Sequence, residues 1–311
     1  MSTYLLPLLQ AREDYGDTPQ GPAQTLVNDT ARPILAGLIA ATALWGVANA
    51  QGAMYFKRHS EDGGVVKSIV AGILLLEALH FALLAHGAYF YLITCRTNYE
   101  DLFKPIWSLL IQSFPSTLII AIVRYVFIAR VWTLSQSPSK RIICIGMTVL
   151  AIAEAGLTLT WTIAAFYKPF WGKAGGVVWP SMITFIIRAI NDICLTSQFC
   201  VHLLRSKNGF VNIKRTDKII RTMIFHGLGS GFFACCGSIC LILVLAILPH
   251  SAWYICVYII CTRVYANSLL GMLNSRRQPQ SDPTTQLGSK EMELTTLQQQ
   301  FTAQSRWALD L

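Results

Sequence analysis

Charged residues are scarce in this sequence. They make up 13% of its 311 residues, whereas about 25% is usual for a soluble domain. Hydrophobic residues make up 53%, and the mean hydropathy is +0.47. This composition excludes an ordinary soluble domain and indicates a membrane protein. The net charge of +9 does not predict nucleic-acid binding, because the basic residues lie in short breaks between apolar runs.

The first thirty or so residues lack the features of a cleaved signal peptide. They contain the acids Glu13, Asp14 and Asp17, and the apolar run at residues 5–9 is too short for a signal-peptide core. A disulfide framework is not evident either. All nine cysteines except Cys95 fall inside apolar segments, where cysteine usually serves as a small packing residue.

The sequence also lacks the residue patterns of a catalytic or metal site. Glu77 and His80 form one Glu-x-x-His pair on a helical face, but a di-iron bundle needs two such pairs and two further carboxylates. His86, His202 and His226 fall at different depths and do not make a three-histidine zinc site. We therefore expect a protein that is not an enzyme and has no metal or other cofactor.

Seven apolar stretches are each long enough to span about 30 Å of hydrocarbon as a helix. Pro115 lies inside the third stretch and predicts a kink there. The predicted fold class is therefore an all-α membrane protein, a seven-transmembrane-helix bundle. The stretches are 33–56, 66–94, 106–131, 142–167, 178–204, 221–248 and 252–273.

The basic residues near the ends of these stretches predict the orientation. Most of them gather on the side that holds the C-terminus, which the positive-inside rule places in the cytosol. We expect residues 1–32 to be an extracellular segment, 33–277 the transmembrane domain and 278–311 a disordered cytosolic tail. The expected location is the plasma membrane. Asn28 begins a glycosylation sequon on the outer side, very close to the first helix.

The predicted loop between the fifth and sixth stretches, residues 205–221, is strongly basic. Each base contributes roughly 1 kcal/mol near an anionic leaflet, so this loop should lie on the inner membrane surface. Orientation alone accounts for such a loop. The alternatives are contact with anionic lipid headgroups or coupling to a cytosolic effector. The six bases are Arg205, Lys207, Lys214, Arg215, Lys218 and Arg221.

Three acids and three bases lie inside the apolar stretches and away from their ends, where an unpaired charge is expensive. Together with His80 and Asn267 they form a candidate intramembrane polar network. One interpretation is a ligand or ion site, or a switch that re-pairs on activation, and the other is a static network that fixes packing. The charged members are Glu77, Arg124, Glu154, Arg188, Asp192 and Arg263.

The spacing of these charges predicts how they pair. Arg188 and Asp192 are four residues apart on one helical face and can pair locally. The remaining bases, Arg124 and Arg263, then need an acid from another helix. The acids left for them are Glu77 and Glu154.

The architecture favours a receptor- or sensor-like protein, although it does so by analogy of fold alone. The local signatures of G-protein-coupled receptors are mostly missing, since no acid precedes Arg130 and the last stretch lacks a proline after Asn267. A retinal protein is excluded because residues 252–273 contain no lysine for a Schiff base. The alternative is a secondary transporter or channel that uses the same midplane charges, although the sequence shows no internal repeat of the transporter kind.

Short motifs of this chain resemble a known family. They are the closing run RVYANSLLGMLNSR at Arg263–Arg276, GVANAQGAMYF at 46–56, QSF at 112–114 and, more loosely, RAIND at 188–192. The run resembles the end of a seven-helix membrane family of basidiomycete fungi described as domain of unknown function 6534, and the resemblance covers most of residues 33–277. It implies the fold and the membrane location and implies no activity.

Overall fold

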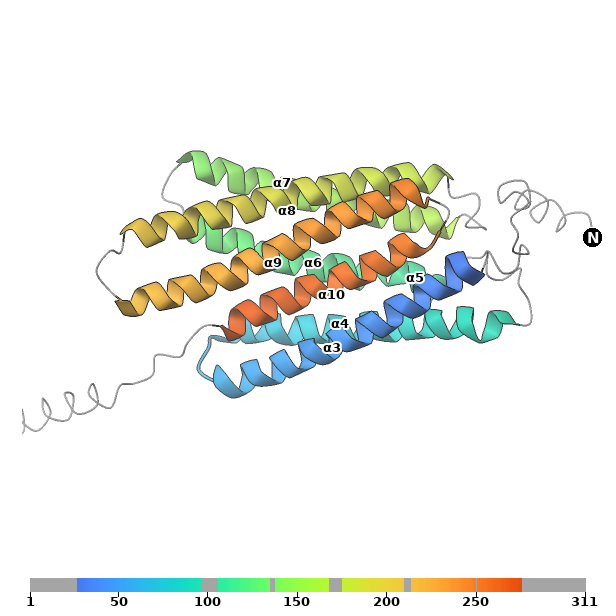
Figure 1. Cartoon of the computed structure of the whole chain (residues 1–311), viewed down its shortest axis with the longest axis horizontal. Helices are drawn as coiled ribbons and strands as arrows, with labels where there is room; N and C mark the ends of the chain where they lie inside the picture. Colours follow the sequence, from blue (N-terminus) through green and yellow to red (C-terminus); the bar gives the residue numbers. More distant parts are fainter. Residues whose placement is uncertain are drawn as a thin grey trace, which may run out of the picture. The chain divides into compact units, whose positions relative to one another are not determined.

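A computed structural model of the chain describes residues 27–96, 106–134, 138–167, 175–209, 214–249 and 251–275. These residues form helices and contain no strand, which confirms the predicted all-α class (Figure 1). The long helices are α3 (Arg32–Arg58), α4 (Gly64–Leu92), α6 (Ser113–Leu134), α7 (Pro138–Phe166), α8 (Gly175–Gly209), α9 (Lys214–Ile247) and α10 (Trp253–Asn274). The short ones are η1 (Val27–Ala31), η2 (Thr94–Arg96) and α5 (Trp107–Ile111).

Several of the described helices have the lengths and surfaces of membrane-spanning segments. Large apolar side chains point outward, as at Leu75, Ile152 and Trp179, which are 72%, 67% and 74% exposed. A hydrophobic outer face suits lipid rather than water, so a multi-pass membrane protein is confirmed. Among the residues that the structure describes, five spans are long and apolar enough to cross a membrane, namely Asp29–Arg58, Gly64–Leu92, Trp107–Trp132, Arg141–Phe166 and Trp253–Asn274.

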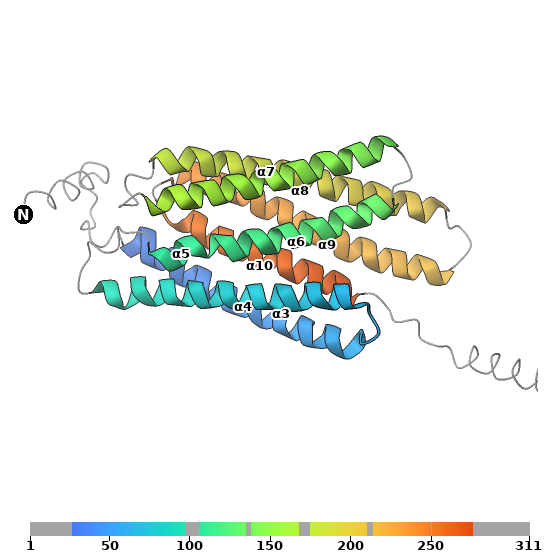
Figure 2. The same cartoon turned by 180° about the vertical axis from the view of Figure 1, so that it is seen from behind.

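Helix α10 occupies the centre of the bundle. It packs against α3, α4, α6 and α9, and in Figures 1 and 2 it runs between α3 and α9. Its middle residues, including Arg263 and Ala266, are fully buried. Because these four helices surround α10, a cation near its middle can be kept away from lipid.

Two asparagines tie α10 to α3. Asn267 Nδ2 donates to the carbonyl oxygen of Leu44 at 3.0 Å, and Asn274 Nδ2 donates to that of Gln51 at 2.8 Å. The two asparagines and the two carbonyls are each seven residues apart, which is about two helical turns. The bonds therefore repeat along one face of each helix and hold the pair in register.

The third predicted stretch is interrupted near Pro115, as the sequence suggests. Helix α5 ends at Ile111, Gln112 follows, and α6 begins at Ser113. A proline ring collides with the carbonyl group four residues earlier, which here belongs to Ile111. The interruption therefore lies one turn before the proline rather than at it.

The predicted loop at residues 205–221 is wrong in its boundaries. Helix α8 continues to Gly209 and α9 begins at Lys214, because lysine and arginine are good helix formers and need not end a helix at the membrane surface. With 35 and 34 residues, both helices are about 50 Å long, well above the roughly 30 Å of the hydrocarbon layer. In Figures 1 and 2 their joined ends reach past the ends of α3 and α10.

Several predicted features lie outside the described residues. They include the side chains of Asn28 and of all six bases in 205–221, and residues 1–26 and 276–311. The chain divides into two units, 1–276 and 277–311, and the described helices all belong to the first.

Candidate functional site

The six charged residues of the apolar stretches are all buried in the bundle. None of Glu77, Arg124, Glu154, Arg188, Asp192 and Arg263 is more than 3% exposed. Charges buried this deeply must be paired and hydrogen-bonded to be tolerated. The structure arranges them in two groups, one around Glu154 and Asp192 and the other around Glu77.

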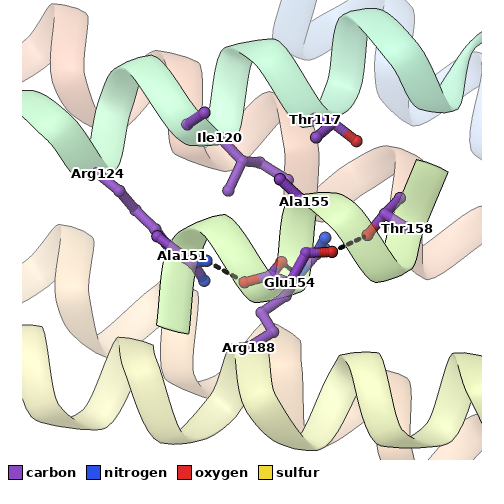
Figure 3. Close-up of a pocket in the computed structure, with 9 residues that line it drawn as sticks. Thr117, Ile120, Arg124, Ala151, Glu154, Ala155, Thr158 and Arg188 are labelled. Carbon is purple, nitrogen blue, oxygen red and sulfur yellow. Dashed lines mark hydrogen bonds and ion pairs between the residues drawn. The ribbon is translucent and has the colours of Figure 1, made fainter. Parts of the chain in front are cut away.

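Glu154 of α7 binds two arginines from different helices. Its Oε1 atom accepts a hydrogen bond from Arg188 Nε of α8 at 2.7 Å, and its Oε2 atom pairs with Arg124 of α6. Figure 3 shows the two arginine side chains reaching Glu154 from separate helices. One carboxylate thus connects three helices, α6, α7 and α8.

Asp192 of α8 is the second node of this group. Arg124 Nη2 donates to Asp192 Oδ1 at 2.8 Å, and Ser238 Oγ of α9 donates to Asp192 Oδ2 at 2.7 Å. The hydroxyl of Tyr265 in α10 also donates to Oδ2. We call the resulting set the central cluster, and its members are Arg124, Glu154, Arg188, Asp192, Ser238 and Tyr265.

Aromatic rings cover the arginines of the central cluster. The Arg188 guanidinium carbon lies 5.2 Å from the ring centroid of Tyr258 and 5.8 Å from that of Phe185, and that of Arg124 lies 5.8 Å from the ring of Tyr265. A ring face attracts a cation at these distances. The rings therefore supply part of the stabilisation that water supplies elsewhere.

The predicted local pair between Arg188 and Asp192 is wrong. The two residues are on one helix, yet Arg188 binds Glu154 and Asp192 binds Arg124. Burial explains the difference, because a buried carboxylate needs several hydrogen bonds to offset the loss of water. The crossed arrangement gives each acid at least two donors from other helices.

The second group joins α4 to α10. Arg263 pairs with the Glu77 carboxylate, and its Nη1 atom also donates to the Glu77 carbonyl oxygen at 3.1 Å. His80 is fully buried one turn after Glu77, and neither of its ring nitrogens has a hydrogen-bond partner among the described residues. Asn267 lies one turn after Arg263, and its Nδ2 atom donates to two backbone oxygens, those of Leu44 in α3 and of Arg263, rather than to a charged side chain.

A small pocket adjoins the central cluster between α6, α7 and α8. It encloses about 240 Å³ when its open mouth is included, and the enclosed part has room for about one water molecule. Figure 3 shows its polar lining, which includes Arg124, Glu154 and Arg188. The complete lining is Thr117, Ile120, Ala121, Arg124, Ala151, Glu154, Ala155, Thr158 and Arg188.

Charge balance in the sequence pointed to the arginines and carboxylates but not to their neutral partners. Ser238 and Tyr265 both donate to Asp192, yet a serine or tyrosine in an apolar stretch is common and carries no charge signal. The only sequence signal for Tyr265 is its place in the closing run that begins at Arg263.

Comparison with known proteins identifies one family. Residues 188–278 match the model of the family of unknown function DUF6534. The matched segment begins at Arg188 and extends through α10, and so contains Asp192, Ser238, Arg263 and Tyr265. No curated protein and no solved structure matches the chain. The match includes the motifs at 188–192 and 263–276 and confirms that resemblance, whereas those at 46–56 and 112–114 lie outside it, and residues 188–278 connect this membrane protein to the family of unknown function DUF6534.

Proposed function

We propose that this chain is a receptor- or sensor-like membrane protein whose central cluster switches between two pairing arrangements. The observation that carries the proposal is the shared position of Arg124. One of its nitrogens binds Glu154 of α7 and another binds Asp192 of α8. A movement of α6 along its neighbours would favour one acid over the other without leaving the arginine unpaired.

The charges of the central cluster make such an exchange feasible. Two arginines and two carboxylates balance, so the cluster can rearrange without changing its net charge. Arg124 Nε and Arg188 Nη1 have no hydrogen-bond partner among the described residues, and these donors are available to a second arrangement. A two-state element biased by a ligand is the physical basis of a receptor.

The bundle has other means of fixing its packing. The asparagine bonds between α3 and α10 hold register with neutral groups. Replacing a buried ion pair by apolar residues of similar volume is often neutral or stabilising. A purely structural role would therefore not need four charges in one cluster, which supports a switch over a static network.

This function suits a protein of the plasma membrane with seven spans. Its N-terminus would lie outside the cell and its C-terminus in the cytosol. Arg188 is paired with Glu154 of α7 and Asp192 with Arg124 of α6, which lets α8 cross the bilayer despite its charges. The ends of α8 and α9 would then project into the cytosol. The bases of 205–221 would be available there to anionic lipid headgroups or a cytosolic effector.

The test is a distance measurement across the cluster in a lipid bilayer. Spin-labelled unnatural amino acids at the exposed positions Tyr125 of α6 and Ile239 of α9 report their relative movement. We expect one dominant distance in the parent protein and a second population in Asp192→Asn, because Arg124 loses the charge of one partner. The control is Arg141→Gln, which removes an exposed arginine outside the cluster.

The same preparation separates the static and transport alternatives. A lower melting temperature for Asp192→Asn with an unchanged distance distribution would show that the cluster only fixes packing. Net movement of protons or a solute in proteoliposomes that contain no cytosolic partner would instead favour the secondary transporter or channel, which uses the same midplane charges.

A further inference from the structure

The pocket beside the central cluster opens toward the outer surface of the bundle. Its mouth is lined by the exposed Ala121 of α6 and the half-buried Ala151 and Ala155 of α7. The neighbouring side chains Tyr125 and Ile152 are 68% and 67% exposed. In a bilayer this surface faces acyl chains, so whatever enters the pocket comes from the lipid phase.

The floor of the pocket offers both donors and acceptors. Arg188 is 1% exposed and its Nη1 atom has no partner among the described residues, and the same holds for Nε of Arg124, which is 2% exposed. The hydroxyls of Thr117 and Thr158 donate to the carbonyl oxygens of Ser113 and Glu154 at 2.7 and 2.8 Å. Their oxygens are then left as acceptors.

A hydroxyl group matches this combination better than a charged group. It can accept from an arginine and donate to a threonine oxygen, and its single oxygen fits a space of about one water molecule. A carboxylate is larger and would meet the Glu154 carboxylate in the same pocket. The site therefore selects a neutral oxygen on an apolar body.

The depth of the pocket restricts where that oxygen lies on the ligand. The lining residues Thr117–Arg124 lie at the middle of the span Trp107–Trp132, and Ala151–Thr158 lie at the middle of Arg141–Phe166. The midpoint of a hydrocarbon layer about 30 Å thick is about 15 Å from either surface. A headgroup oxygen stays at the surface, whereas a hydroxyl far along an acyl chain reaches this depth.

We infer that the pocket between α6 and α7 binds an acyl chain that carries a hydroxyl group near its middle. The hydroxyl accepts a hydrogen bond from Arg188 and donates to the oxygen of Thr158, and the chain lies against the alanines of the mouth. This inference rests on the proposed receptor function and names the class of its ligand. Because Arg188 also binds Glu154, occupancy of the pocket acts directly on the central cluster.

The test compares two radiolabelled probes on the purified full-length protein in lipid nanodiscs. One is octadecanoic acid with a hydroxyl group near the middle of its chain, and the other is octadecanoic acid itself. A hydrogen bond to a charged group contributes about 1.5–3 kcal/mol, which corresponds to at least about tenfold tighter binding. We expect the hydroxylated acid to bind at least about tenfold more tightly.

Three variants locate the binding. Ala155→Leu fills the mouth and should lose the preference for the hydroxylated acid. Thr158→Val removes the acceptor with little change in shape and should reduce the preference, because Arg188 can still donate. Ala153→Leu adds the same volume to an exposed position of α7 that does not line the pocket, so it should keep the preference. Melting temperatures check that every variant folds. If Ala155→Leu does not fold, Thr158→Val alone tests the binding site.

Equal binding of the two acids by the parent protein would overturn the inference, as would an unchanged preference in Thr158→Val. Either result would leave the proposed switch intact, since its distance measurement uses no added acid. The binding site would be supported and the switch refuted if Asp192→Asn kept the single distance of the parent protein while Thr158→Val reduced the preference for the hydroxylated acid.

Discussion

At the residue scale, the central cluster depends on how many donors each carboxylate receives. Asp192 has three donors, from Arg124, Ser238 and Tyr265. Removing a charged partner outright leaves a buried ion uncompensated, which costs about 3–5 kcal/mol in soluble proteins. Removing a neutral donor costs less stability, because no charge is left unpaired, and it measures the contribution of a single hydrogen bond.

We therefore predict that Tyr265→Phe lowers the stability of the protein by about 1.5–3 kcal/mol, because Asp192 loses one hydrogen bond to a charged acceptor. The measurement is reversible unfolding in mixed detergent micelles. Tyr125→Phe removes the same single oxygen from a side chain that is 68% exposed, and it should change stability by less than about 0.5 kcal/mol. Equal effects of the two substitutions would contradict the assigned hydrogen bond.

At the scale of elements, close helix contacts depend on where glycine allows them. A Cβ atom at Gly52 of α3 would lie 2.5 Å from Leu74 Cδ1 of α4, whereas one at Gly46 of the same helix would meet nothing within 4 Å. Alanine is the better helix former by about 1 kcal/mol. Comparing an alanine substitution at Gly52 with one at Gly46 therefore separates the cost of the collision from the gain in helix propensity.

We predict that Gly52→Ala destabilises the protein by about 1–3 kcal/mol, because the collision with Leu74 exceeds the gain in helix propensity. Gly46→Ala should leave the stability unchanged or raise it by up to about 1 kcal/mol. Thermal unfolding of both variants in the same detergent measures the difference. A stabilised Gly52→Ala would show that the Leu74 side chain moves aside at little cost.

At the scale of the whole molecule, the lengths and charges of the helices determine how the chain crosses the bilayer. Five spans have the length and apolar composition that crossing requires. Helices α8 and α9 are longer than the hydrocarbon layer and include the six basic residues of 205–221. The positive-inside rule places such residues in the cytosol.

We predict that an epitope tag before residue 1 is reached by antibody on intact cells and that one after residue 311 is reached only after permeabilisation. The reason is the excess of basic residues on the side of the C-terminus. Permeabilised cells, in which both tags should be stained, are the control. The reverse staining pattern on intact cells would refute the orientation, and equal access to both tags would refute an odd number of spans.

The sequence by itself determined the features that depend on local composition. The apolar runs predicted the helices and the membrane environment, Pro115 predicted the interruption between α5 and α6, and the closing run from Arg263 indicated the family. Each of these follows from neighbouring residues. The six buried charges were recognised for the same reason, since a charge inside an apolar run is visible without any partner.

Only the tertiary structure decided which residues meet. Arg124 finds Glu154 and Asp192 across 30 and 68 residues, and Arg263 finds Glu77 across 186. The sequence favoured a local Arg188–Asp192 pair, because spacing along one helix is all that it reveals. How separate helices pack decides the crossed pairs, the neutral donors to Asp192 and the pocket at the lipid-facing surface. The physical reason is that a buried charge is stable only where several partners offset its loss of water, and those partners come from different helices.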